Sequence, residues 1–106
     1  MSDDYLPGIY QQFLERFPEV AEAQGHLART IRERNPFDGR TDRLIKLAIA
    51  VGAEAEGAVR SNVRKALKHG ASLDEVRAVA LAAVTTCGFP AAIAALGWIE
   101  EVATAP

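Results

Sequence analysis

Two segments of this chain are apolar around nearly their whole circumference, and this limits the possible folds more than any other feature. Residues 44–51 read LIKLAIAV and carry one charge, and residues 78–84 read AVALAAV and carry none. A helix without a polar face has to be surrounded by other protein. A chain of 106 residues has too much surface for its volume to enclose two such helices. We therefore expect a homo-oligomer, most simply a closed symmetric one, in which other copies cover the remaining apolar area.

Every segment has helical periodicity, and none alternates with period two for long enough to be a strand, so the sequence predicts an all-α fold of about six helices. Pro18 suits the first turn of the second helix. Residues 35–39, NPFDG, read as a turn. Either Asp38 or Thr41 can cap the third helix, whose apolar pattern starts soon afterwards. Gly52 marks its far end, before the helix that begins near residue 56.

The second half of the chain carries clearer start and stop signals. Gly70 ends the fourth helix, and the stretch Ser72-Leu73-Asp74-Glu75 has the pattern of a capping box that starts the fifth. We expect this fifth helix to run from Leu73 to about Cys87. Gly88 then stops it, and Pro90 opens a sixth helix rich in alanine.

Composition narrows the class of protein. The length predicts a single domain, residues 1–106, and a net charge of -2 argues against a nucleic-acid partner. No apolar run is long enough to span a bilayer, and the N-terminal MSDDYLPG has no signal-peptide pattern. One cysteine cannot form an internal disulfide and fits a reducing compartment, so we expect a cytoplasmic protein without a membrane partner.

Several kinds of site can be discarded from the sequence. It contains no glycine-rich phosphate loop and no Cys-x-x-Cys pair, and its two histidines, His26 and His69, fall on different predicted helices. They supply too few ligands for a zinc site at any usual spacing. We therefore expect no metal and no cofactor.

The segment 54–67, EAEGAVRSNVRKAL, holds the main candidates for chemistry. Wound as a helix at about 100° per residue, it places Asn62 in the middle of an apolar arc. A buried amide without partners costs on the order of 1–3 kcal/mol, so Asn62 should meet a backbone group, a water, another subunit or a ligand. Glu56 lies four residues before Arg60, and the two can pair on one face. Glu56 or Arg60 would then line a small polar pocket together with Asn62.

Cys87 is a further candidate for lining a ligand site. It follows two threonines at a predicted helix end and precedes Gly-Phe-Pro, so polar groups meet an apolar neighbourhood there. A lone thiol in such a place is more often a small core residue than a nucleophile.

The run from Asp42 to Val102 resembles the carboxymuconolactone decarboxylase-like superfamily, which includes the alkylhydroperoxidase D proteins. The resemblance rests on VRKAL followed by a Gly-Ala-Ser helix cap with acidic residues, and on CGFPAA at the start of the last helix. It implies an all-helical, alkylhydroperoxidase D-like fold that assembles as a homotrimer or homohexamer. That assembly agrees with the expectation from the apolar helices.

The resemblance also implies that catalytic groups are missing. In the hydroperoxidase branch a Cys-x-x-Cys pair, a histidine four residues later and a glutamate one helix earlier do the chemistry. In this chain these positions hold Ala55, Ala58, Asn62 and Arg43. Without a thiolate pair, no nucleophile attacks a peroxide and no second thiol resolves the sulfenic acid.

The decarboxylase branch resembles this chain more closely. It also lacks the cysteines, and it keeps an acidic residue around Glu56, a histidine at the position of Asn62 and a Cys-Gly-x-Pro-Ala-Ala stretch, here residues 87–92. An amide can hydrogen-bond a carboxylate or a lactone carbonyl but cannot carry a proton as histidine does near pH 7. The resemblance therefore predicts a degenerate active site at Asn62.

Three functions remain open at this point. The chain could be a lyase or isomerase for a small carboxylated or lactone substrate, with Glu56 as acid and base, Arg60 binding the anion and Asn62 orienting the carbonyl. It could instead be a non-catalytic binding or structural oligomer whose pocket has lost its proton carrier. The third and weakest candidate is a peroxide reductase that uses Cys87.

Overall fold

The computed structural model describes residues 8–105, and within that range every regular element is an α-helix. This confirms the predicted all-α fold. The six helices are α1 (Gly8–Arg16), α2 (Pro18–Glu33), α3 (Gly39–Gly52), α4 (Glu56–Lys68), α5 (Leu73–Val84) and α6 (Phe89–Ala103). They form two compact units that divide between Pro36 and Phe37.

The first unit consists of α1 and α2, which pack against each other. The rings of Phe13 and Phe17 lie 5.8 Å apart at the corner between them. Pro18 occupies the first turn of α2, as predicted, where its missing N–H leaves no helical hydrogen bond unmade. No residue of either helix is buried.

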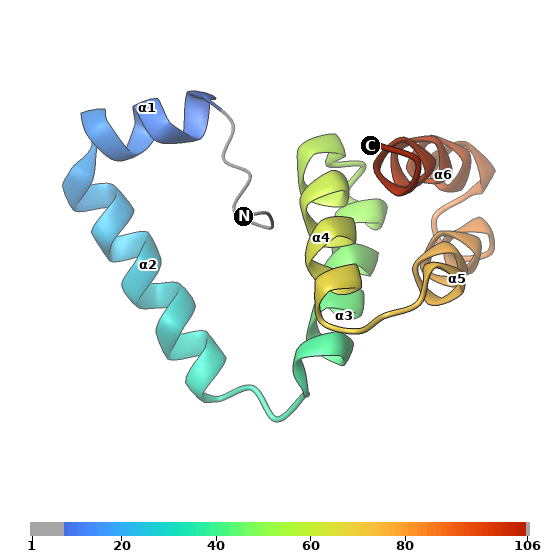
Figure 1. The fold of residues 1–106 in the computed structure, drawn as a ribbon, viewed down its shortest axis with the longest axis horizontal. Coiled ribbons are helices and arrows are strands. Elements are labelled where there is room, and N and C mark those ends of the chain that lie inside the picture. The colour runs from blue at the N-terminus through green and yellow to red at the C-terminus, as the bar shows by residue number, and fades with distance from the viewer. Residues whose placement is uncertain (1–7, 106) are drawn as a thin grey trace. The chain divides into compact units, whose positions relative to one another are not determined.

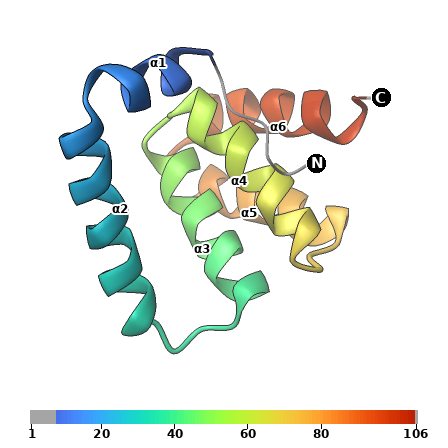
Figure 2. The same ribbon diagram turned by 60° about the vertical axis from the view of Figure 1, so that its left-hand side comes forward.

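The second unit is a four-helix body formed by α3 to α6 (Figures 1 and 2). In this body α3 packs on α4 and α5, while α6 packs on α5 and α4. Its core is built from aliphatic side chains on the inner face of each helix, because a helix with one apolar stripe buries that stripe against its neighbours. The largest fully buried side chains are Leu47, Val51, Val59, Val63, Val76 and Ile99.

Helix caps fix where these helices begin. The Asp38 carboxylate accepts a hydrogen bond of 2.7 Å from the Thr41 backbone N–H, so Asp38 rather than Thr41 caps α3. At the start of α5 the predicted capping box is confirmed: the Glu75 N–H donates to the Ser72 hydroxyl at 3.0 Å, and the Ser72 N–H donates to Glu75 at 2.9 Å. Hydrogen bonds from the Ser72 backbone and then from Arg40 lower the pKa of Glu75. Arg40 belongs to α3, so this cap also ties α3 to α5.

The end of α5 differs from the prediction. The helix ends at Val84 and not near Cys87, because the backbone N–H groups of residues 86, 87 and 88 all turn back to the carbonyl of Ala83. Gly88 follows with a φ of 101° and leads into α6, with Pro90 in its first turn as expected. The prediction that Gly88 stops α5 is therefore wrong: the helix already ends at Val84, and Gly88 instead precedes the first turn of α6.

The connection between α3 and α4 places Glu54 in the left-handed region, with a φ of 53°. The N–H of Glu54 donates to Val51 and that of Ala55 to Ala50, which is the hydrogen-bond pattern of a glycine-type helix C-cap. Because this conformation strains a side chain with a Cβ, we expect Glu54→Gly to raise the free energy of unfolding by about 1 kcal/mol. Urea denaturation followed by circular dichroism measures this. The matched control is Ala53→Gly, at a right-handed position, which should lower stability instead.

Candidate functional site

Arg60 lies between two carboxylates. Its guanidinium donates to Glu56 one turn earlier in α4 and, at 2.5 Å, to Glu101 of α6. Both carboxylates raise the pKa of Arg60, Glu56 more strongly than Glu101. The predicted pairing of Glu56 with Arg60 is thus confirmed, but the second partner comes from a helix 41 residues further on. Arg60 joins α4 to α6, and its charge is already balanced without a ligand.

Asn62 is half-buried and lies at the edge of the apolar face of α4, so the prediction that it occupies the middle of that face is wrong. The fully buried residues of α4 are Val59, Val63 and Ala66, which are centred further around the helix, while Ala58 is exposed. The Asn62 side-chain N–H donates to the Ala58 carbonyl at 3.0 Å. The amide therefore finds one partner in its own helix and keeps a second N–H for another group.

Cys87 is exposed, so the alternative interpretation of a small core residue is wrong within one chain, and its place in a ligand site stays a prediction. Its sulfur lies 3.6 Å from the Thr86 hydroxyl and beside the end of α3, where a Cβ added to Gly52 would lie 3.5 Å away. These contacts belong to the α5–α6 turn and do not join Cys87 to the group formed by Glu56, Arg60 and Glu101. The physical reason is the early end of α5, which carries residues 85–87 out of the helix.

The two histidines lie in separate places, as predicted. The Nδ1 of His69 is 2.8 Å from the Lys65 carbonyl at the end of α4, and its ring covers Gly39 at the start of α3. His26 lies on α2, in the other unit. Within residues 8–105, no three histidine, cysteine, aspartate or glutamate side chains are grouped so that they could hold a metal ion. No helix of the described chain is long and apolar enough to cross a bilayer.

Arg43 stands where the family resemblance places a glutamate, and the sequence pattern assigned no role to the arginine itself. It is half-buried on α3, four residues before Leu47 and seven before Ala50, both buried. Residues with this spacing share one helix face, so a cation stands at the start of a buried stripe. Among residues 8–105 no hydrogen bond or ion pair satisfies its guanidinium. The sequence signal was the i, i+4, i+7 spacing, but nothing in the sequence indicated that Arg43 would have no carboxylate partner among residues 8–105.

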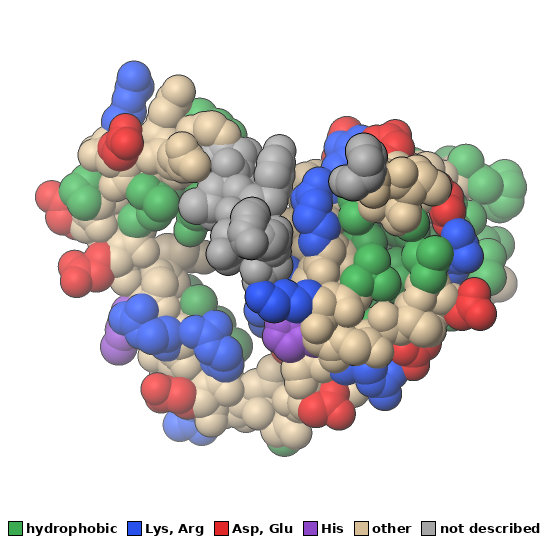
Figure 3. All heavy atoms as spheres, viewed as in Figure 1, with side chains coloured by type: hydrophobic (Ala, Val, Ile, Leu, Met, Phe, Trp, Pro, Cys, Tyr) green, Lys and Arg blue, Asp and Glu red, His purple; other side chains and the backbone are tan. Residues whose placement is uncertain are grey.

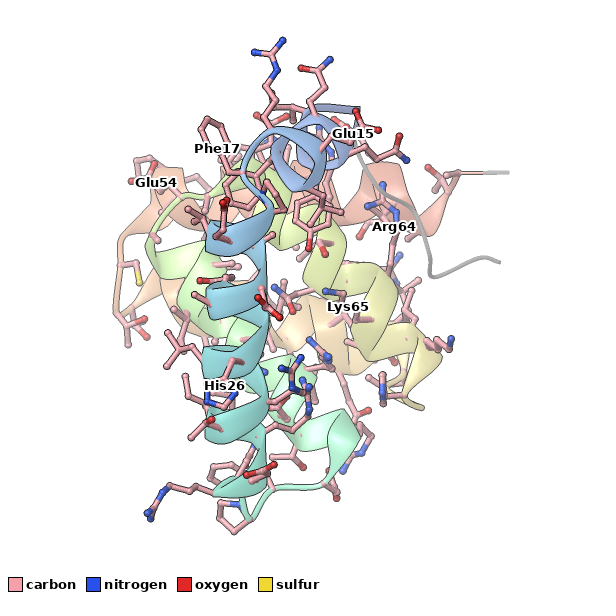
Figure 4. All side chains as sticks on the ribbon, turned by 90° about the vertical axis from the view of Figure 1, so that its left-hand side faces the viewer. Glu15, Phe17, His26, Glu54, Arg64 and Lys65 are labelled. Carbon is pink, nitrogen blue, oxygen red and sulfur yellow. The ribbon has the colours of Figure 1, made fainter. Side chains whose placement is uncertain are left out.

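The candidate site residues therefore do not form one cluster on the four-helix body. Glu56, Arg60 and Glu101 link α4 to α6, whereas Arg43 and Asn62 lie on the two helices of the α3–α4 pair. Figure 4 shows Glu54 in the connection between α3 and α4, with Arg64 and Lys65 further along α4. The body is a small all-α domain, and the charged and amide side chains of the candidate site lie on α3, α4 and α6.

Comparison with known proteins gives the family. The model of the carboxymuconolactone decarboxylase family matches residues 18–101. An uncharacterized protein, MJ1511, from Methanocaldococcus jannaschii is similar to this chain, with 30% identity over 86 residues that span 81% of this chain and 80% of that protein. The chain belongs to the carboxymuconolactone decarboxylase family. The match extends the resemblance found between residues 42 and 102 back to the start of α2.

Proposed function

We propose that this protein is a homo-oligomeric member of its family that binds a small carboxylated or lactone metabolite without transforming it. The observation that carries the proposal is the amide of Asn62, which stands where the family resemblance places a proton-carrying histidine and is hydrogen-bonded to the Ala58 carbonyl. An amide neither takes up nor releases a proton near neutral pH, so it binds a carbonyl or carboxylate oxygen but does not drive proton transfer.

The ion pairs around Arg60 support the same proposal. An acid–base role for Glu56 requires it to exchange a proton with a substrate, but Glu56 is paired with Arg60 and is exposed to solvent. In water the substrate competes with the solvent for such a carboxylate. Arg60 is shared between two carboxylates, so a substrate anion would have to displace one of them.

Exposed apolar residues support the homo-oligomer. On the four-helix body Ile49 is 66% exposed, Leu81 58%, Phe89 62% and Ile93 48%. Figure 3 shows hydrophobic side chains together at the outer edge of α5 and α6. Apolar surface that gathers in patches, rather than scattering singly, marks contacts with other protein. A trimer or a hexamer would cover it, as the family resemblance implies.

The competing function is a purely structural oligomer. It is favoured by the way Arg60 joins α4 to α6, because this makes the polar cluster a link between helices. The two functions differ in whether the purified protein binds any small carboxylate. They agree in predicting no turnover.

Incubation with carboxymuconolactone, the compound in the family's name, separates binding from catalysis. We expect calorimetry to detect binding of the lactone and to find it unchanged in Glu56→Gln, because the carboxylate of Glu56 is held by Arg60. We expect no release of carbon dioxide and recovery of intact lactone. Decarboxylation by the wild type that Glu56→Gln abolishes would establish the enzyme instead. If neither the lactone nor any simpler carboxylate binds, the structural oligomer is the better account.

A further inference from the structure

We propose that Arg43 and Asn62 together form a binding site for a carboxylate anion along the contact between α3 and α4. The inference rests on the proposed function and names the residues that would recognise the ligand. Three observations support it: the side of its helix on which each residue lies, the partial burial of both side chains, and the absence of a carboxylate partner for Arg43 among residues 8–105.

Arg43 lies on the half of the buried face of α3 that is turned away from Arg40 and α5. The inner face of α3 is marked by Leu47, Ala50 and Val51, all buried. Its α5-facing edge is identified by Arg40, which pairs with Glu75 of α5. On a helix at about 100° per residue, Arg40 projects between Leu47 and Val51, whereas Arg43 projects about 60° around the helix, between Leu47 and Ala50. Because α3 packs on both α5 and α4, the edge turned away from α5 is the one beside α4.

Asn62 lies on the edge of α4 that faces α3. The opposite edge is identified by Arg60, which pairs with Glu101 of α6. The buried residues Val59, Val63 and Ala66 lie between these two edges. Since α4 packs on both α6 and α3, Asn62 is on the α3 side. Arg43 and Asn62 therefore belong to the two edges that meet where α3 and α4 pack.

The two residues also lie at similar heights along the helix pair. α3 and α4 run in opposite directions from a connection of three residues, 53–55. At about 1.5 Å per residue, Arg43 is about 14 Å from the end of α3 and Asn62 about 9 Å from the start of α4. The difference is less than one helical turn, which the long side chain of an arginine spans. An anion between them would receive the N–H groups of the guanidinium and the second N–H of the amide.

The partial burial of Arg43 favours the binding of an anion beside its guanidinium. The half-buried guanidinium of Arg43 has lost part of its hydration, and no carboxylate among residues 8–105 compensates for that loss. Arginine binds carboxylates through two parallel N–H groups and is never neutral in a protein. Close by, Lys46 is paired with Asp42 at 3.0 Å, so that carboxylate is already engaged on the same helix. The exposed Ala58, one turn before Asn62, adds no bulk at this position.

The ligand class follows from the donors. The guanidinium of Arg43 has only N–H donors, and the amide of Asn62 adds one more N–H donor beside its oxygen. Such a set of donors selects an anion whose oxygens lie in one plane, as those of a carboxylate do. In the peroxide-reducing relatives the resemblance places a glutamate and a histidine at these two positions. In this chain Arg43 replaces the glutamate and Asn62 replaces the histidine. These replacements change a site for proton transfer into a site that binds an anion.

Titration with succinate tests the inference, with succinamide as its uncharged match. In nitrogen–proton NMR spectra we expect the Nε–H resonance of Arg43, identified by its loss in Arg43→Gln, to shift saturably with succinate and not with succinamide. Arg43→Gln should weaken succinate binding at least about tenfold, because a hydrogen-bonded charge pair is lost. Arg43→Lys should retain part of the affinity. The matched control, Arg29→Gln, removes the same charge from an exposed position on α2 and should change nothing.

A second variant tests whether the two residues face each other. Asn62→Asp is nearly isosteric and gives Arg43 an internal carboxylate, so it should abolish succinate binding and raise the melting temperature. If Arg43→Gln binds succinate as the wild type does, or if succinate produces no saturable shift of Arg43, the inference is wrong. Binding that survives in Arg43→Gln would leave the proposed function standing and place its site elsewhere. An unchanged melting temperature in Asn62→Asp with binding intact would show that the residues do not face each other.

Discussion

Replacing Leu47 with alanine is expected to lower the free energy of unfolding by about 2–5 kcal/mol. Leu47 lies on the inner face of α3, is fully buried, and belongs to the cluster where the helices of the four-helix body meet. Its removal leaves a cavity that close-packed neighbours fill only in part, which adds to the lost transfer free energy. Chemical denaturation followed by circular dichroism measures the change.

The same truncation at Leu81 is the control. Leu81 lies on α5 and is 58% exposed, so within one chain Leu81→Ala removes few contacts and should cost much less. Its cost should also depend on protein concentration, because Leu81 lies on the surface that we propose another copy covers. Equal costs for the two variants at every concentration would contradict the assignment of core and surface.

Replacing Ile93 with glutamate is expected to weaken self-association at least about 100-fold. Ile93 lies on the outer face of α6, in the same helix as the exposed Phe89. A carboxylate enclosed at a protein contact without a partner costs several kcal/mol, and each 1.4 kcal/mol is a factor of ten in the association constant. Sedimentation velocity over a range of concentrations measures the shift.

The control variant also adds one negative charge, but at a position away from the proposed contact. Gln24→Glu introduces one negative charge at an exposed polar position of α2 and should leave association unchanged. Ile93→Glu should keep its helical content, since Ile93 is 48% exposed in the single chain. An unaltered oligomer in Ile93→Glu would exclude this part of α6 from the contact.

Local signals in the sequence predicted most of the fold. The capping box at Ser72 and the stop at Gly70 depend on residues three or four apart, and both are present. The choice between Asp38 and Thr41 as the cap of α3 was left open because either side chain can accept a backbone N–H. The end of α5 was misplaced because three N–H groups converge on one carbonyl, that of Ala83, and residue type alone does not reveal that convergence.

The candidate site was less predictable, because its decisive contacts join distant helices. The pairing of Glu56 with Arg60 follows from their spacing, but Glu101 reaches Arg60 from α6 and could not be found by periodicity. Asn62 was placed too deep because the helix wheel counted Ala58 as buried, whereas Ala58 is exposed. Small residues are poor markers of a buried face because they cost little in either environment.

Native mass spectrometry of the gently purified protein tests the central claim most directly, because it reports the assembly and any small molecule that remains bound. We predict a trimer or hexamer that carries a ligand with the mass of a small carboxylate or lactone, released on denaturation. A stable monomer would contradict the proposed assembly. An oligomer that is empty under every mild condition, and stays empty after incubation with carboxylates and lactones, would contradict the binding function and favour the structural oligomer.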